Sequence, residues 1–271
     1  MILERFRLDD RVALVTGAGM GIGRATSLAL AEAGARVVCC ARTQSDIDET
    51  AKQVESAGSE GLAVRCDVTD SAELDALVAA TIERFGRIDV LVNNAGGMKP
   101  APAFDLSEED FERILRFNLT SAFLLTQKVV PHMMRTAGGG SVVNISSGAS
   151  EMMIQGLAPY AAAKAGLNQL TRVLGLEYAP DVRLNAIIVG HVLTAAATST
   201  ASEEELQAAG AAVPLGRLGQ PEDIAACALY LASPASEWVT GQVYAVNGGA
   251  NFAPHQFPVP GLKERFPGPD Q

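Results

Sequence analysis

The chain has 271 residues, 48% of them hydrophobic, and a formal net charge of −10, which is enough for one large or two small domains with a sizeable core. The negative charge disfavours nucleic-acid binding, which requires a basic surface, and no uninterrupted apolar run is long enough to cross a membrane. Residues 1–10 are charged and lack the apolar core of a signal peptide, so we expect a cytoplasmic protein with one core-forming domain.

The first predicted elements are a strand over 11–16 and a helix over 21–33, joined by a glycine-rich turn. Strand, turn and helix in this order form the opening unit of a doubly wound α/β sheet. A glycine run can be merely a turn, but this position favours dinucleotide binding, because glycines let the backbone approach phosphates and a helix N-terminus presents free N–H groups. The spacing is G-x-x-x-G-x-G and not the common G-x-G-x-x-G. The residues that we expect to bind the phosphates are Gly17, Met20, Gly21, Ile22 and Gly23.

The second predicted strand, over 35–41, ends without an acidic residue and is followed by Arg42. A carboxylate at this point would bind the ribose 2′-hydroxyl of NAD, whereas a basic residue suits the 2′-phosphate of NADP. The sequence therefore favours NADP(H) and leaves NAD(H) possible. The alternative is that Arg42 is only a surface charge, and Met20 supplies no second basic group in the glycine turn.

Helices and strands continue to alternate in the first half of the chain, with a helix over 44–57, a strand over 62–66, a helix over 70–85 and a strand over 88–92. Asp67 follows its strand directly and is placed to meet an adenine amino group, beside Val68. Asn94, Ala95 and Gly96 follow the strand over 88–92. Small and amide residues at the carboxyl end of a strand suit the crevice where ligands bind in such sheets.

A long helix is predicted over 107–135, with an apolar stripe that includes Ile114 and Ala122. Asn118 lies on this stripe, and a buried amide needs hydrogen-bond partners. It is either a satisfied core asparagine or part of a relay that holds a water molecule.

Another helix is predicted over 160–179, because the segment is rich in alanine and leucine. Tyr160 and Lys164 are therefore one turn apart on the same face. At about 6 Å and an effective dielectric constant of about 20, the ammonium favours the phenolate by roughly 2.8 kcal/mol, which lowers the tyrosine pKa by about two units. An oxidised nicotinamide ring and the Ser147 hydroxyl could lower it further. Taken alone, a Y-x-x-x-K pattern also arises by chance.

The chain ends with a predicted helix over 221–231, a last strand over 242–246 and a proline-containing tail over 251–271. The tail either covers a neighbouring subunit or has no fixed structure. Cys39 and Cys40 are adjacent on a predicted strand, where alternation points them to opposite faces. The cysteines and histidines follow no metal-binding spacing, and we predict no metal site.

Together these residues resemble the short-chain dehydrogenase/reductase family over nearly the whole chain. The resemblance rests on the glycine motif at 16–23, the N-N-A-G at 93–96, Ser147, and the Y-x-x-x-K that begins at Tyr160. Ser147 lies thirteen residues before Tyr160, as the family requires, which selects it over Ser146. The resemblance implies a single Rossmann-type domain over residues 1–250, in which helices cover both faces of a sheet of seven mostly parallel strands.

The resemblance also implies a catalytic tetrad of Asn118, Ser147, Tyr160 and Lys164. Tyr160 would exchange a proton with the substrate oxygen, and Ser147 would hydrogen-bond the same oxygen. Lys164 would lower the tyrosine pKa and hold the nicotinamide ribose, so that both Tyr160 and Lys164 also contact the cofactor. Asn118 would position a water molecule that connects Lys164 to solvent.

The family places a Gly and a Thr against the nicotinamide carboxamide after the sixth strand, and Gly190 and Thr194, with Val192 between them, match this pattern without its usual proline. Residues 194–213 correspond to the mobile lid of the family. The family usually forms homotetramers or homodimers, and we expect one of these here.

The substrate pocket is predicted to be apolar, lined by Met98, Met152, Met153, Ile154 and Leu157, with His191 beside it. These residues favour a hydrophobic ketone or secondary alcohol, such as a steroid, 3-oxoacyl or cyclic terpenoid compound. One alternative is a catalytically silent NAD(P)-binding regulatory protein, which would be free to lose its catalytic serine and tyrosine. A sugar-nucleotide epimerase is a weaker alternative, because such enzymes usually need a longer C-terminal region.

Overall fold

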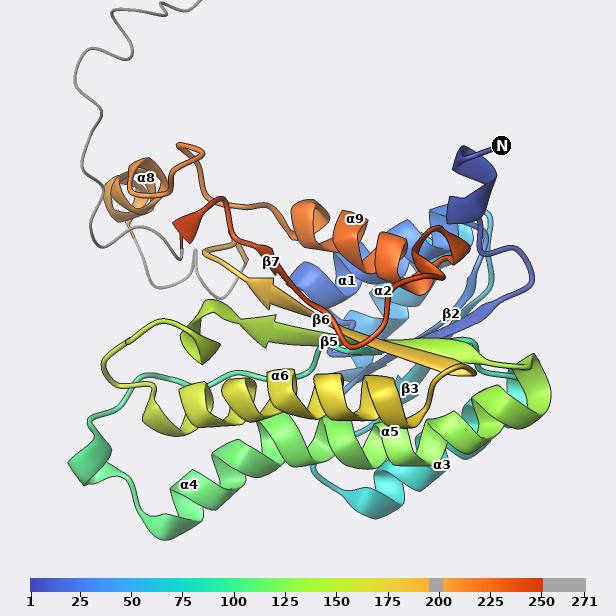
Figure 1. Ribbon diagram of the computed structural model, residues 1–271, viewed down its shortest axis with the longest axis horizontal. Coiled ribbons are helices and arrows are strands. Elements are labelled where there is room, and N and C mark those ends of the chain that lie inside the picture. Colours follow the sequence, from blue (N-terminus) through green and yellow to red (C-terminus); the bar gives the residue numbers. More distant parts are fainter. Residues whose placement is uncertain (195–201, 251–271) are drawn as a thin grey trace, which may run out of the picture.

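A computed structural model describes residues 1–194 and 202–250 of the chain. The predicted tail and part of the predicted lid lie outside these residues. The fold is built on one seven-stranded sheet in the order β3-β2-β1-β4-β5-β6-β7, and all of its pairings are parallel (Figure 1). The strands are β1 (Val12–Thr16), β2 (Arg36–Ala41), β3 (Gly61–Arg65), β4 (Val90–Asn93), β5 (Gly140–Ser147), β6 (Val182–Val189) and β7 (Val243–Val246).

Helices cover both faces of the sheet, as the sequence predicts. Figure 1 shows α1, α2 and α9 on one face and α3, α5 and α6 on the other. The helices are α1 (Gly21–Glu32), α2 (Gln44–Ser56), α3 (Ser71–Phe85), α4 (Glu108–Leu115), α5 (Ser121–His132), α6 (Ala158–Glu177), α8 (Glu203–Ala211) and α9 (Pro221–Ala232).

Two apolar cores fill the space between the sheet and its helices, and the alternation of side chains along each strand separates them. On β1, Ala13 and Val15 belong to the core under α1, α2 and α9, while Leu14 belongs to the core on the other side. Cys39 and Cys40 divide in the same way, and both are fully buried. The prediction that these two thiols point to opposite faces is confirmed.

Polar side chains begin several of the helices. Ser107 accepts a hydrogen bond from the backbone N–H of Asp110, whose carboxylate accepts in return, so that a complete capping box opens α4. Helix α3 begins with only half of such a box. Asp70 caps the helix, but the Glu73 carboxylate accepts from the backbone N–H of Asp67 at 2.8 Å and not from that of Asp70.

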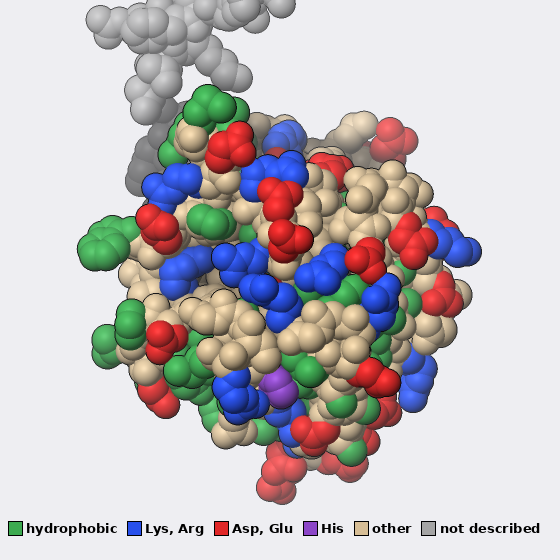
Figure 2. Space-filling view, turned by 90° about the vertical axis from the view of Figure 1, so that its right-hand side faces the viewer, with side chains coloured by type: hydrophobic (Ala, Val, Ile, Leu, Met, Phe, Trp, Pro, Cys, Tyr) green, Lys and Arg blue, Asp and Glu red, His purple; other side chains and the backbone are tan. Residues whose placement is uncertain are grey.

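The amino ends of the strands lie at the end of the molecule shown in Figure 2, where basic and acidic side chains are intermixed. Asp89 precedes β4 and is 2% exposed. Its carboxylate accepts from Arg11 at 2.8 Å, from Arg87 at 2.6 Å and from the backbone N–H of Val12 at 2.9 Å. This carboxylate therefore ties the start of β1 to the start of β4.

Among the described residues, no helix is long and apolar enough to span a membrane. Within the same residues, no group of three or more His, Cys, Asp or Glu side chains is arranged to hold a metal ion.

The strand order reverses between β1 and β4, because the chain runs from β1 outwards to β3 and then returns to add β4 on the other side of β1. In open parallel sheets, ligands bind at the carboxyl ends of the strands at such a point. The topology therefore predicts a ligand-binding site at the carboxyl ends of β1 and β4.

Candidate active site

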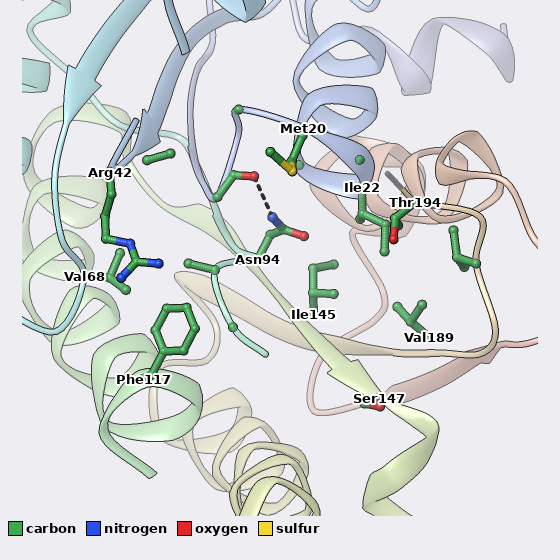
Figure 3. Close-up of a pocket in the computed structure, with 18 of the residues that line it drawn as sticks. Met20, Ile22, Arg42, Val68, Asn94, Phe117, Ile145, Ser147, Val189 and Thr194 are labelled. Atoms are coloured by element: carbon green, nitrogen blue, oxygen red, sulfur yellow. Dashed lines mark hydrogen bonds between the residues drawn. The ribbon is translucent and has the colours of Figure 1, made fainter. Parts of the chain in front are cut away.

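A cleft of about 510 Å³ lies at the carboxyl ends of the strands, across the point where the strand order reverses (Figure 3). Its walls come from the residues that follow β1, β2, β3 and β4, from the ends of β5 and β6, and from α6. One extended cleft therefore joins elements that are far apart in the sequence.

The glycine turn after β1 is braced against Asn94. The Asn94 side-chain N–H groups donate to the carbonyl oxygens of Thr16 at 2.9 Å and Gly17 at 3.1 Å. Gly17 has a φ of +64°, and a Cβ there would lie 2.7 Å from Asn94 Nδ2. A Cβ on Gly23 would lie 2.1 Å from the Gly17 carbonyl oxygen. Gly17 requires glycine because of its positive φ and the nearby Asn94, and Gly23 because the turn packs directly against the first turn of α1.

The N-terminus of α1 opens into this cleft. No side chain caps the helix, and its first turn carries no acidic residue. Met20, Gly21, Ile22 and Gly23 all line the cleft. Uncapped N–H groups at the positive end of a helix dipole bind anions. This arrangement fits the pyrophosphate of a dinucleotide.

Arg42 and Phe117 form the far end of the cleft. The Arg42 guanidinium carbon lies 5.9 Å from the centroid of the Phe117 ring, and Figure 3 shows the side chain reaching past Val68 towards that ring. Asp67 lines the same end. Its burial opposes ionisation, but hydrogen bonds from Thr69 and the nearby Arg42 outweigh this effect, and the Asp67 pKa is lowered. This end therefore offers a guanidinium group and an aromatic ring to a ligand.

Lys164 lies at the opposite end and is 3% exposed. Its Nζ donates to the Ile145 carbonyl oxygen at 2.8 Å. Burial lowers the Lys164 pKa to about 8, because a charged ammonium loses its hydration in the interior. At neutral pH the group remains largely protonated.

Asn118 lies beside Lys164, beneath the cleft, and is 1% exposed. Its Oδ1 accepts from the backbone N–H of Gly97 at 2.7 Å, and its Nδ2 donates to the carbonyl oxygens of Gly97 at 3.1 Å and Ile114 at 3.0 Å. The side-chain amide therefore has hydrogen-bond partners on both its oxygen and its nitrogen, and the water relay stays a prediction. A Cβ on Gly96 would lie 2.7 Å from Asn118 Oδ1 and 3.1 Å from Lys164 Nζ, so glycine lets these two groups approach.

Tyr160 lies one helical turn before Lys164, whose Nζ is 5.7 Å from the centroid of the tyrosine ring. Burial raises the Tyr160 pKa above its ordinary value, and a hydrogen bond with the Ser147 side chain opposes this rise. The net lowering of the pKa expected from the sequence is therefore wrong, because desolvation of the phenolate outweighs the groups that favour it.

The predicted helix over 107–135 is interrupted at Asn118. A π-helical turn, Arg116–Thr120, separates α4 from α5, and a second π-helical turn, Met133–Ala137, follows α5. The Asn118 side chain donates to the Ile114 carbonyl oxygen, four residues earlier. In a regular helix that carbonyl accepts from the backbone of residue 118, so the side chain competes with the helical pattern. Single π turns of this kind are frequent at functional sites.

A family model described as enoyl-(acyl carrier protein) reductase matches residues 17–251, which is most of the chain. The chain belongs to the short-chain dehydrogenase/reductase family. Members of this family are oxidoreductases that act on alcohol and carbonyl groups with a nicotinamide cofactor.

Some of the similar proteins are named for a substrate, and others are uncharacterized. An uncharacterized oxidoreductase of Mycobacterium tuberculosis is 43% identical over 97% of this chain and 100% of its own length. The 7α-hydroxysteroid dehydrogenase of Escherichia coli is 39% identical over 91% of this chain and 96% of its own. A solved 7α-hydroxysteroid dehydrogenase, complexed with NADH and 7-oxo glycochenodeoxycholic acid, superimposes with a TM-score of 0.87 at 39% identity, over 91% of this chain and 96% of that one. An actinorhodin polyketide ketoreductase with NADPH gives 0.85 at 38% identity, over 89% and 97%.

The cleft brings together every residue that the sequence assigns to the family's cofactor site. These are Gly17, Met20, Gly21, Ile22, Gly23, Arg42, Asp67, Val68, Asn94, Ala95, Gly96, Tyr160, Lys164, Gly190, Val192 and Thr194. Ser147 lines the cleft as well, whereas Asn118 lies below its surface. Their roles in binding and catalysis stay predictions.

The residues expected to line the substrate pocket are not part of this cleft. Met153 is 103% exposed and Ile154 is 38% exposed, because the segment between β5 and α6 turns these side chains towards solvent. His191 lines a separate small pocket of about 100 Å³. Met98, Met152 and Leu157 are only partly buried. The apolar substrate pocket therefore stays a prediction.

Sequence reasoning missed Phe117 and Asp46, which both line the cleft. Phe117 immediately precedes Asn118, and Asp46 follows Arg42 by four residues. Their closeness in the sequence to Asn118 and Arg42 could have indicated them. A phenylalanine or an aspartate at these positions does not by itself indicate a binding site.

Proposed function

We propose that the protein is an NADP(H)-preferring carbonyl reductase or alcohol dehydrogenase that acts on a hydrophobic ketone or secondary alcohol. The observation that carries this proposal is that one cleft has Arg42 at one end and Ser147, Tyr160 and Lys164 at the other. A dinucleotide bound along the uncapped N-terminus of α1 would connect the two ends.

The proposed chemistry divides between cofactor and protein. The nicotinamide supplies or accepts a hydride at the substrate carbon. In reduction, Tyr160 donates its phenolic proton to the carbonyl oxygen, and in oxidation it accepts the proton of the alcohol. Ser147 donates a hydrogen bond to the same oxygen and stabilises the charge that develops there. Lys164 favours the phenolate and holds the nicotinamide ribose, and Asn118 orders a water molecule towards Lys164.

The preference for NADP(H) rests on Arg42. Its guanidinium group lines the cleft directly after β2, where a 2′-phosphate would lie. A guanidinium group binds phosphate through charge-assisted hydrogen bonds, each contributing about 1.5–3 kcal/mol. Asp46 lies on the next helix and also lines the cleft, which places one negative charge near the site. Stacking on Phe117 holds Arg42 at this end of the cleft.

The relatives support the substrate class that the sequence favours. The similar proteins include a hydroxysteroid dehydrogenase and a polyketide ketoreductase, whose names point to bulky apolar carbonyl compounds. We propose a steroid, a 3-oxoacyl compound or a similar substrate, bound by Met98, Met152, Met153, Ile154, Leu157 and His191. We further propose that the protein works in the cytoplasm as a homodimer or homotetramer.

The test is a kinetic panel with the purified protein. Steroid, 3-oxoacyl and cyclic terpenoid ketones are each offered with NADPH and with NADH, and kcat/KM is compared. The proposal predicts turnover of at least one apolar ketone, with NADPH favoured by about tenfold or more. Tight NADPH binding without turnover on the whole panel would instead favour a catalytically silent regulatory protein.

A further inference from the structure

Helix α6 carries a third polar residue on the stripe that bears Tyr160 and Lys164. Asn168 lies four residues after Lys164 and is 4% exposed. Residues at this spacing share one face of a helix. The proposed chemistry accounts for the tyrosine and the lysine but gives no role to the buried amide.

Asn168 is linked to Ser147 through Ser150. The Asn168 Nδ2 donates to Ser150 Oγ at 2.9 Å, and Ser150 Oγ donates to the Ser147 carbonyl oxygen at 2.7 Å. Ser150 ends the short 3-10 turn Gly148–Ser150 that follows β5. Ser147, the last residue of β5, caps this turn by accepting from the backbone N–H of Ala149 at 3.2 Å.

The side-chain amide of Asn168 is the donor at the start of this series of hydrogen bonds. A serine hydroxyl has one hydrogen, and here Ser150 gives it to the Ser147 carbonyl oxygen. Ser150 Oγ can then only accept from its other neighbour, and the NH₂ group of Asn168 is the donor that meets it. The Asn168 Oδ1 is buried and has no hydrogen-bond partner among the described residues, so the amide is held in place by its nitrogen.

We infer that Asn168 is a positioning residue, which acts through Ser150 to fix the Ser147 hydroxyl relative to Tyr160. Ser147 is the last residue of β5 and the N-cap of the turn that follows, whereas Tyr160 lies on α6. Two groups that bind one substrate oxygen must keep a constant separation, and catalysis is sensitive to displacements of about 1 Å. The Asn168–Ser150 bond ties the turn to the helix. This inference rests on the proposed function for the roles of Ser147 and Tyr160.

The variants Asn168→Leu and Ser150→Ala each break this link. Leucine keeps the branching and the number of non-hydrogen atoms of asparagine, although its volume is larger, and it also removes the unpartnered oxygen. We expect kcat to fall about five- to tenfold in either variant, the size of one lost hydrogen bond, with KM for NADPH unchanged. The double variant should be no worse than Ser150→Ala alone, because both changes remove one pathway. Ser150→Thr keeps the hydroxyl and should restore turnover.

A pH profile separates positioning from general loosening of α6. The hydrogen bond from Ser147 favours the Tyr160 phenolate, so the pH at which alcohol oxidation reaches half its maximum should rise in Asn168→Leu. Thr171→Val is the matched control. Thr171 is fully buried on the same helix, donates to the Leu167 carbonyl oxygen and accepts from Asn144 of β5 at 2.9 Å, but it has no hydrogen bond to Ser150 or Ser147. It should lower stability without moving the profile.

Hydrogen exchange supplies a readout that does not need turnover. The peptide that spans residues 147–151 should exchange faster in Asn168→Leu and in Ser150→Ala, while protection of α6 is unchanged. A normal kcat and pH profile in an active protein, or unaltered exchange of this peptide, would overturn the inference. A wild-type protein without turnover on any ketone would count against the proposed function instead, and the exchange measurement would still decide this link.

Discussion

Replacing Lys164 by Met removes the ammonium that lies 5.7 Å from the centroid of the Tyr160 ring, while keeping an unbranched side chain of similar length. For an ammonium and a phenolate oxygen about 6 Å apart, at an effective dielectric constant of about 20, the charge favours the phenolate by roughly 2.8 kcal/mol. The loss of this interaction reduces the ionised fraction of Tyr160 at a given pH by about 100-fold.

The assay is kcat for alcohol oxidation between pH 6 and pH 8, where the Lys164 pKa of about 8 leaves the wild-type group mostly protonated. We expect kcat to fall about 100-fold at pH 7 in Lys164→Met, and the rise of kcat with pH to move about two units towards alkaline pH. Affinity for NADPH serves as the control for the lost ribose contact. A variant whose pH profile stays in place would refute the electrostatic role of Lys164.

The same substitution has a pH-dependent effect on stability. Burial lowers the Lys164 pKa from 10.5 to about 8, so the cost of burying its charge is fully present below pH 8 and disappears as the pH rises towards 10.5. The cost is of the order of 3 kcal/mol. The free energy of unfolding of the wild type, relative to Lys164→Met, should therefore increase between pH 7.5 and pH 10.5 in urea titrations. A constant difference across this range would contradict the burial of a charged lysine.

Three further substitutions test other parts of the cleft and the fold. Arg42→Asp should reverse the cofactor preference by lowering kcat/KM for NADPH about 100-fold, whereas Arg65→Asp, the same charge change on a neighbouring strand outside the cleft, should leave the ratio of NADPH to NADH unchanged. Gly96→Ala should lower kcat at least tenfold, because its Cβ would lie 2.7 Å from Asn118 Oδ1 and 3.1 Å from Lys164 Nζ; unimpaired turnover would mean that these two groups have room to move. Asp89→Asn should lower the free energy of unfolding by about 2–4 kcal/mol in urea titrations, because it leaves two guanidinium groups without their carboxylate; a loss below about 0.5 kcal/mol would show that this ion-pair network stabilises nothing.

The sheet and its cofactor cleft could be predicted because their signals are local. A β-rich run, a glycine turn and a helix follow one another within about twenty residues at the start of the chain. The opposite orientations of Cys39 and Cys40 needed only the alternation of side chains along a strand. Arg42 could be placed in the cleft because it directly follows β2.

The features that the sequence did not predict depend on contacts between distant segments or on burial. At the π turn, the Asn118 side chain donates to the Ile114 carbonyl oxygen in place of a backbone N–H group. Hydrophobic periodicity does not predict this hydrogen bond. The raised pKa of Tyr160 comes from burial, which a spacing argument between two residues leaves out. Met153 was expected in an apolar pocket because of its residue type, yet the loop before α6 turns it to solvent.

The most direct test of the account is the comparison of Tyr160→Phe with the wild type in two measurements, turnover and NADPH binding. Phenylalanine keeps the ring and removes only the hydroxyl that handles the proton. We expect ketone reduction to fall by about 1,000-fold or more, while NADPH affinity measured by fluorescence stays within about threefold of the wild type. Turnover at the wild-type rate in this variant would contradict the assignment of Tyr160 as the proton donor.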